Sequence, residues 1–215
     1  MKPGDALWLA LRDFYANSWR LVPVNAALGA VLVLATVAAL AMPAAAVLVV
    51  FAGPVAAALV HCAVTLVRTE NLVLSDALDG LRLHWRVGLG LGASGCVLVA
   101  LGGLAIRFYG GSSLWPLAFL TLYLLVLLAV YQLIVWTLAI AQPGRPFGSV
   151  LRDAGVVFGS RPVATLALGL LLLLVNIAGL AAAVMPFLTL TIAYSFLAAA
   201  HFALPRSPLR DPPLE

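Results

Sequence analysis

The stretch Leu114–Ala141 reads LWPLAFLTLYLLVLLAVYQLIVWTLAIA, and its 28 residues include no Lys, Arg, Asp or Glu. A transmembrane helix needs about 20 consecutive, predominantly apolar residues to cross the hydrocarbon core of a bilayer. Because the run is continuously apolar and does not alternate, it lacks the pattern of a transmembrane β-strand. Backbone polar groups in lipid must be satisfied within their own segment, so we predict that this stretch is a transmembrane helix.

Five further stretches have the same composition, and the chain as a whole matches them. Its 215 residues are 64% hydrophobic and 9% charged, with a mean hydropathy of +1.13. Soluble domains contain about 25% charged residues, so most of this chain requires lipid as its solvent. We predict an all-α polytopic membrane protein with six transmembrane helices. The five further spans are Leu21–Met42, Ala44–Val67, Val87–Ile106, Pro162–Val184 and Pro186–Leu204.

The gaps between these runs alternate between short turns and longer, charged segments. The short gaps are Pro43, Arg107–Ser113 and Met185, and the long gaps are Arg68–Arg86 and Gln142–Arg161. This alternation predicts three helical hairpins that are all closed on the same side. We expect residues 1–204 to form one six-helix transmembrane domain, followed by a Pro-rich cytoplasmic tail over residues 205–215.

Basic residues are distributed unevenly over the two sides that these spans define. Arg107 falls on the side of the short turns, and the other eleven of the twelve fall on the opposite side. Short loops rich in Lys and Arg remain in the cytoplasm, so we predict a multi-pass protein of the cell membrane with both termini cytoplasmic. The eleven residues are Lys2, Arg12, Arg20, Arg68, Arg82, Arg86, Arg145, Arg152, Arg161, Arg206 and Arg210.

The net charge of +4 comes from these basic residues on the cytoplasmic side. A basic patch is the usual mark of a nucleic-acid-binding protein, but these residues are divided among helix ends. We therefore expect contact with the bilayer and with anionic lipid headgroups, and no nucleic-acid partner.

The charged segments on the cytoplasmic side have the pattern of amphipathic helices. In Ser75–Arg86, the apolar residues Leu78, Leu81 and Trp85 recur at helical spacing beside a charged stripe. Ser75 is the expected N-cap of this helix. Residues 5–20 and 149–161 repeat the spacing, so we expect a short helix along the membrane surface before each hairpin.

Short fragments recur between these segments and favour a degenerate threefold repeat. Asp-Ala-Leu occurs at residues 5–7 and 76–78, Leu-Arg-Asp at 11–13 and 151–153, and Trp-Arg at 19–20 and 85–86. The units would span about residues 5–67, 75–141 and 149–204. Alternatively, any protein built from hairpins places Trp and Arg at its cytoplasmic interface.

Polar side chains inside lipid are costly, so they are the first candidates for function. The candidates are Asn25, His61, Asn176 and His201. Three of them, Asn25, His61 and His201, lie toward the cytoplasmic ends of their spans and could converge on one polar pocket. Two histidines without carboxylates or thiolates make a poor metal site, so we expect neither metal nor cofactor. Alternatively, all four tie helices together by hydrogen bonds.

Glycine and proline mark two further features of the spans. Gly53 and Pro54 interrupt the second run near its middle, which indicates either a hinge, as in transporters, or a static kink. In the third run, Gly88, Gly92 and Gly95 form a face of small residues that permits close helix packing.

Residues at the junctions between amphipathic helices and spans are expected to contact lipid or a partner. These are Arg20, Trp85, Arg86 and Arg161. Motifs of phosphate loops, zinc proteases and serine hydrolases are missing from the sequence. We therefore predict no catalytic residues.

Several short motifs resemble the YesL-like family of bacterial integral membrane proteins. They include Asn25, Gly53-Pro54 followed by Ala56-Ala57-Ala58-Leu59, Leu66-Val67-Arg68 with Glu70, Asp76 with Trp85-Arg86, Leu151-Arg152-Asp153-Ala154 and Arg161-Pro162. The resemblance covers most of the chain. It implies a polytopic protein associated with carbohydrate uptake, and no catalytic residue carries over from it.

Three functions therefore remain open. The first is a non-enzymatic accessory or scaffold protein that assembles with another membrane protein, or with itself, in a solute uptake system. The second is a small transporter or channel with a cytoplasm-facing polar pocket. The third is an intramembrane enzyme or a lipid-handling protein, with a headgroup site between the basic helices at Arg20, Arg86 and Arg161.

Overall fold

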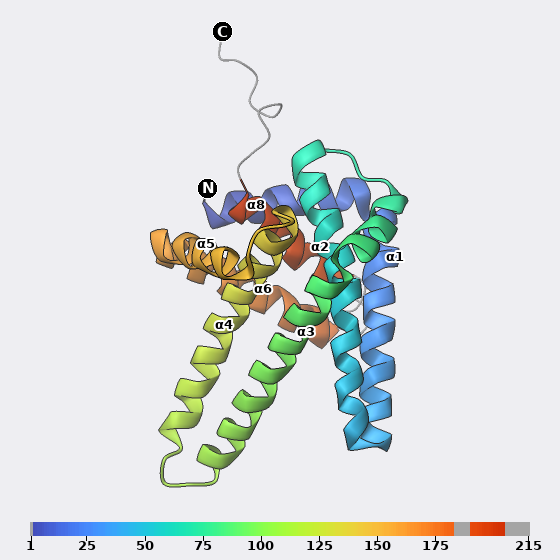
Figure 1. Cartoon of the computed structure of the whole chain (residues 1–215). Coiled ribbons are helices and arrows are strands. Elements are labelled where there is room, and N and C mark those ends of the chain that lie inside the picture. Colours follow the sequence, from blue (N-terminus) through green and yellow to red (C-terminus); the bar gives the residue numbers. More distant parts are fainter. Residues whose placement is uncertain (1, 183–189, 205–215) are drawn as a thin grey trace.

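The computed structural model describes residues 2–182 and 190–204, and every regular element in those ranges is a helix (Figure 1). The all-α prediction is confirmed. The elements are α1 (Pro3–Ala41), the 3₁₀ helix η1 (Pro43–Phe51), α2 (Ala52–Thr69), α3 (Leu74–Gly110), α4 (Pro116–Ala141), α5 (Phe147–Ser160), α6 (Pro162–Ala182) and α8 (Ile192–Ala203).

Five of the described helical segments are long and apolar enough to cross a bilayer, which suggests a multi-pass membrane protein. They are Pro3–Ala41, Ala44–Thr69, Leu74–Gly110, Pro116–Ala141 and Pro162–Ala181. Large apolar side chains on them face outward, as at Leu101, Leu104 and Phe119, which are 60%, 66% and 64% exposed. Such surfaces need lipid rather than water around them.

The sixth predicted span, Pro186–Leu204, begins outside the described residues, as does the turn expected at Met185. Its described part contains α8, an apolar helix of 12 residues. Residues 195–201 of α8 are all buried, and α8 contacts α1, α2 and α4. This short helix is therefore part of the core, where Leu197 packs in the same cluster as Leu59 and Ile134.

The two short turns within the described ranges lie at the same end of the molecule. Figure 1 shows the turn between α1 and η1 and the turn between α3 and α4 at the bottom. The first part of α1, the end of α2 and α5 lie at the opposite end. We call this opposite end the charged end, because Lys2, Arg12, Arg68, Arg145 and Arg161 belong to its segments.

The three amphipathic segments join the following apolar runs in three different ways. In α1 the helix continues through a kink at Asn17, whose φ of −118° and ψ of 18° are non-helical. In α3 no break separates the segment from the run. Arg161 separates α5 from α6, because Pro162 can begin a helix but disfavours a helical conformation in the residue before it.

The prediction that Ser75 caps the third long helix is wrong. The N-cap is Val73, in an extended conformation, and Ser75 lies inside the first turn. The Val73 N–H donates to Asp76 Oδ2 at 2.8 Å, which is the return half of a capping box. An acidic residue three positions after the cap therefore decides where this helix begins.

Glycines bring α2 and α3 into backbone contact. A Cβ added at Gly88 would lie 2.7 Å from the carbonyl oxygen of Gly53, and one at Gly92 would lie 3.1 Å from the Gly53 Cα. One at Gly80 would lie 2.7 Å from the His61 Cβ. The small-residue face is confirmed at Gly88 and Gly92, but it does not extend to Gly95, where nothing lies within 4 Å.

The interruption predicted at Gly53 and Pro54 appears as a change of helix type. The chain is 3₁₀-helical up to Phe51 and α-helical from Ala52. Pro54 falls in the first turn of α2, where its missing N–H costs no hydrogen bond within the helix. Proline thus marks the start of α2 and does not kink its interior.

Gly88→Ala should lower the melting temperature of the purified protein. The added Cβ would lie 2.7 Å from Gly53 O and 2.9 Å from the Ala57 Cβ, and overpacking of this kind costs about 1–3 kcal/mol. Gly90→Ala is the matched control on the same helix, because nothing lies within 4 Å of its added Cβ. Circular dichroism during heating in detergent measures both variants. Equal melting temperatures would contradict the α2–α3 contact.

Candidate functional site

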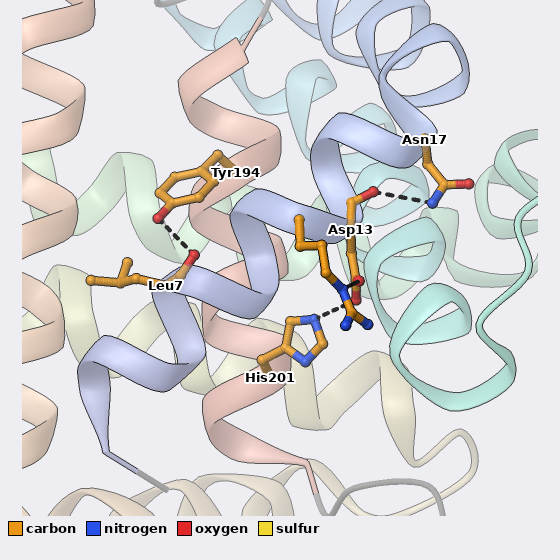
Figure 2. Close-up of polar contacts among 6 residues, drawn as sticks. Leu7, Asp13, Asn17, Tyr194 and His201 are labelled. Carbon is orange, nitrogen blue, oxygen red and sulfur yellow. Dashed lines mark hydrogen bonds and ion pairs between the residues drawn. The ribbon is translucent and has the colours of Figure 1, made fainter. Parts of the chain in front are cut away.

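A buried histidine and a carboxylate meet between α8 and the first part of α1. His201 is 3% exposed, and its Nε2 lies 3.0 Å from Asp13 Oδ2 (Figure 2). With Asp13 ionised, its oxygen accepts this hydrogen bond and His201 Nε2 donates it. The Asp13 side chain is 13% exposed, and Arg12 Nε lies 3.4 Å from its Oδ1.

Neighbouring polar groups hold this pair in place. Asn17 donates from Nδ2 to the backbone oxygen of Asp13 at 3.1 Å, and Arg20 donates from Nη1 to Asn17 Oδ1 at 3.2 Å. Tyr194 lies two helical turns before His201 on the same face of α8, and its hydroxyl donates to Leu7 O at 3.1 Å. Figure 2 shows Tyr194 and His201 reaching the first part of α1 at two points. These bonds fasten the amphipathic part of α1 to the core helix α8.

His201 also forms part of the wall of a polar cavity at the charged end. The cavity has a volume of about 960 Å³, and its wall includes both cations and a carboxylate. They come from the start of α1, from the α5–α6 junction and from α8. The polar residues that line it are Lys2, Asp5, Ser160, Arg161 and His201. The predicted interfacial residue Arg161 therefore belongs to this cavity.

His61 lies elsewhere, against a second histidine that the sequence interpretation had passed over. Its ring centroid is 5.2 Å from that of His84, and His84 is 6% exposed. Both line a different cavity, of about 450 Å³, with Arg68 and Arg145. The expected convergence of Asn25, His61 and His201 on one pocket is therefore wrong, because His61 and His201 line different cavities and Asn25 lines neither of them.

Asn176 joins two helices within the apolar part of the structure. Its Nδ2 donates to Ser195 Oγ at 2.8 Å, which connects α6 with α8. Gln132 does the same between α4 and α3, donating from Nε2 to Ser94 Oγ at 3.0 Å. Both residues border an otherwise largely apolar cavity of about 600 Å³. The alternative interpretation of Asn176, an interhelical hydrogen bond, is the one the structure bears out.

Asn25 is fully buried in α1, and neither atom of its amide has a hydrogen-bond partner among the described residues. It therefore forms no interhelical hydrogen bond there. The described residues also contain no group of three or more His, Cys, Asp or Glu that could hold a metal ion.

Two of the three predicted interfacial arginines, Arg20 and Arg86, stack on neighbouring tryptophans. The guanidinium carbon of Arg20 lies 4.5 Å from the centroid of the Trp19 ring, and that of Arg86 lies 5.2 Å from the Trp85 ring. Trp85 remains 45% exposed. Amphipathic side chains of this kind suit the boundary between headgroups and acyl chains.

Asp13, Tyr194 and His84 were not singled out from the sequence. Asp13 and Asn17 are four residues apart on one helical face, and that spacing is the signal that could have indicated a polar contact. Tyr194 and His84 carried no such signal, because their partners are distant in sequence.

Comparisons with known proteins found no matching protein-family model, no matching curated protein and no matching solved structure.

The Asp13–His201 contact should appear as a coupling in a double-mutant cycle. Asp13→Ala and His201→Ala should each lower stability, and together cost less than their sum by about 0.5–3 kcal/mol. Asp5→Ala is the control, because Asp5 lies on the same helix with an exposed side chain. Urea or heat denaturation in detergent gives the free energies. A coupling no larger for Asp13 than for Asp5 would show that the contact does not form.

Proposed function

We propose that this protein is a non-enzymatic accessory or scaffold protein of the cell membrane, with three hairpins and both termini cytoplasmic. The observation that carries the proposal is that polar side chains of the apolar helices form hydrogen bonds to neighbouring helices. Asn176 donates to Ser195 Oγ at 2.8 Å and Gln132 to Ser94 Oγ at 3.0 Å, so both amides are engaged in bonds between helices. Polar groups engaged in this way hold a bundle together, whereas a transport pathway needs them free to bind solute.

The docking surface in this proposal is the outer stripe of the first part of α1. It consists of Trp8, Leu11, Tyr15 and Trp19, which are 61%, 57%, 85% and 65% exposed. Asp13 and Tyr194 fasten the opposite side of the same helix to α8. A rigid aromatic stripe exposes large contact areas at little entropic cost, which is how interfaces obtain most of their affinity.

The partner in this proposal is another integral membrane protein that presents apolar side chains flanked by carboxylates. Arg12 and Arg20 lie against the rings of Trp8 and Trp19 and supply the complementary charge. The resemblance to YesL-like proteins supports an uptake transporter for carbohydrate as that partner. In this proposal, a degenerate threefold repeat would place three related amphipathic helices on the cytoplasmic face, where the partner binds.

A small transporter is the second candidate, and one observation favours it. The cavity of about 960 Å³ at the charged end brings His201 together with Lys2, Asp5 and Arg161. Its volume is sufficient for a small solute. In this alternative, His201 and Asp13 would bind or release a proton as the solute moves.

The wild-type chain should retain a membrane-protein partner at fixed stoichiometry when it is purified in mild detergent at native expression. Trp8→Ser together with Trp19→Ser should reduce the retained partner at least tenfold, because the stripe loses its two largest anchors. Trp115→Ser is the control, since Trp115 is 57% exposed but lies near the α3–α4 turn. Quantitative mass spectrometry of the eluate measures the ratio.

Two outcomes would contradict the scaffold proposal. One is a wild-type preparation that contains this chain alone. The other is solute uptake by the purified chain in liposomes that is lost in His201→Ala, which would favour the transporter.

A further inference from the structure

The cavity of about 450 Å³ lies where two apolar helices end. Its walls are the last turns of α2, the early part of α3, and the segment that joins α4 to α5. Arg68 and Gln142 line it, and each directly follows the apolar part of its helix. In a bilayer this is the depth of the lipid headgroups, where basic pockets between helices bind anionic lipids.

The described side chains that line this cavity are basic, neutral polar or apolar, and none of them is acidic. Its titratable members are Arg68, Arg145, His61 and His84, and the described lining residues include no Asp or Glu. Three carboxylates lie close by but outside the wall. Asp153 accepts from Arg145 Nη1 at 2.7 Å, and Asp76 and Asp79, in the first turns of α3, are near enough to His61 for electrostatic attraction. Within the described wall itself, a ligand would therefore meet two arginines and no carboxylate.

Arg68 is positioned to bind a tetrahedral anion. Its Nη2 donates to Ala141 O at 2.8 Å, a bond that anchors the guanidinium between α2 and α4. A guanidinium has five N–H donors in a fork that matches phosphate, so this bond leaves others for a ligand. Thr65 lies on the same face of α2 and adds a hydroxyl, and the first residue of α5, Phe147, brings a helix N-terminus to the wall.

We propose that this cavity binds the phosphate group of an anionic phosphoester, with Arg68 and Arg145 as its cationic contacts. The volume lies within the range of small-ligand sites, about 300–1,000 Å³. Most of the remaining wall is apolar and includes Leu83, Val87 and Ile140, which suits the glycerol and first methylenes of a phospholipid. The site lies apart from the aromatic stripe of α1, so it holds or fails independently of the scaffold proposal.

The test uses the purified full chain in a zwitterionic detergent and three probes: dioleoylphosphatidylglycerol, dioleoylphosphatidylcholine and inorganic phosphate. The melting temperature is measured as each probe is titrated. We expect phosphatidylglycerol to raise the melting temperature of the wild type saturably and phosphatidylcholine to leave it unchanged. If inorganic phosphate reproduces the shift at millimolar concentration, the ligand is a free phosphate; if it does not, the ligand is the lipid.

Arg145→Gln is the decisive variant, because the Arg145 side chain is 54% exposed on a loop and its loss should not prevent folding. Arg145→Gln should weaken the apparent affinity for phosphatidylglycerol at least tenfold. Arg68→Gln should weaken that affinity further where the variant folds. Arg152→Gln removes the same charge from an exposed position of α5 outside the cavity, and it should bind like the wild type. Equal binding by Arg145→Gln and Arg152→Gln, or no shift with any probe, would overturn the proposal.

Discussion

The backbone contact between α2 and α3 is the constraint on which the rest of this structure depends. Lipid tails are as apolar as leucine, so helices in a membrane gain little from burying hydrophobic surface and must instead pack closely. Gly53, Gly88 and Gly92 permit that approach, and Gly80 extends it to the charged end. The same contact places His61 against His84, and both residues line the cavity of about 450 Å³.

Polar interactions do different work at the two depths of the molecule. In the apolar part, Asn176 and Gln132 donate hydrogen bonds to side chains of neighbouring helices. At the charged end, His201 and Tyr194 reach out from the core helix α8 to fasten the first part of α1. The aromatic stripe thus lies on a helix whose other side is fastened to the core helix α8.

Sequence reasoning succeeded where the physics is local. A continuous apolar run such as Leu114–Ala141 predicts its helix because lipid leaves the backbone no other partner. Gly53 and Pro54 mark a real change in the chain, but it is a change from 3₁₀ to α helix just before them and neither the hinge nor the interior kink that the sequence suggested. Ser75 is not the cap because α3 already begins at Leu74, where Asp76 accepts the N–H of the N-cap residue Val73.

The amino-acid sequence by itself determined the all-α class, the apolar helices and the segregation of basic residues from the short turns, since composition and hydrogen bonding within a segment decide these. Only the tertiary structure decided that His201 meets Asp13 while His61 meets His84. The rotation and crossing angle of each helix set which side chains face one another. Those quantities depend on packing between segments that are far apart in the chain, and no local pattern records them.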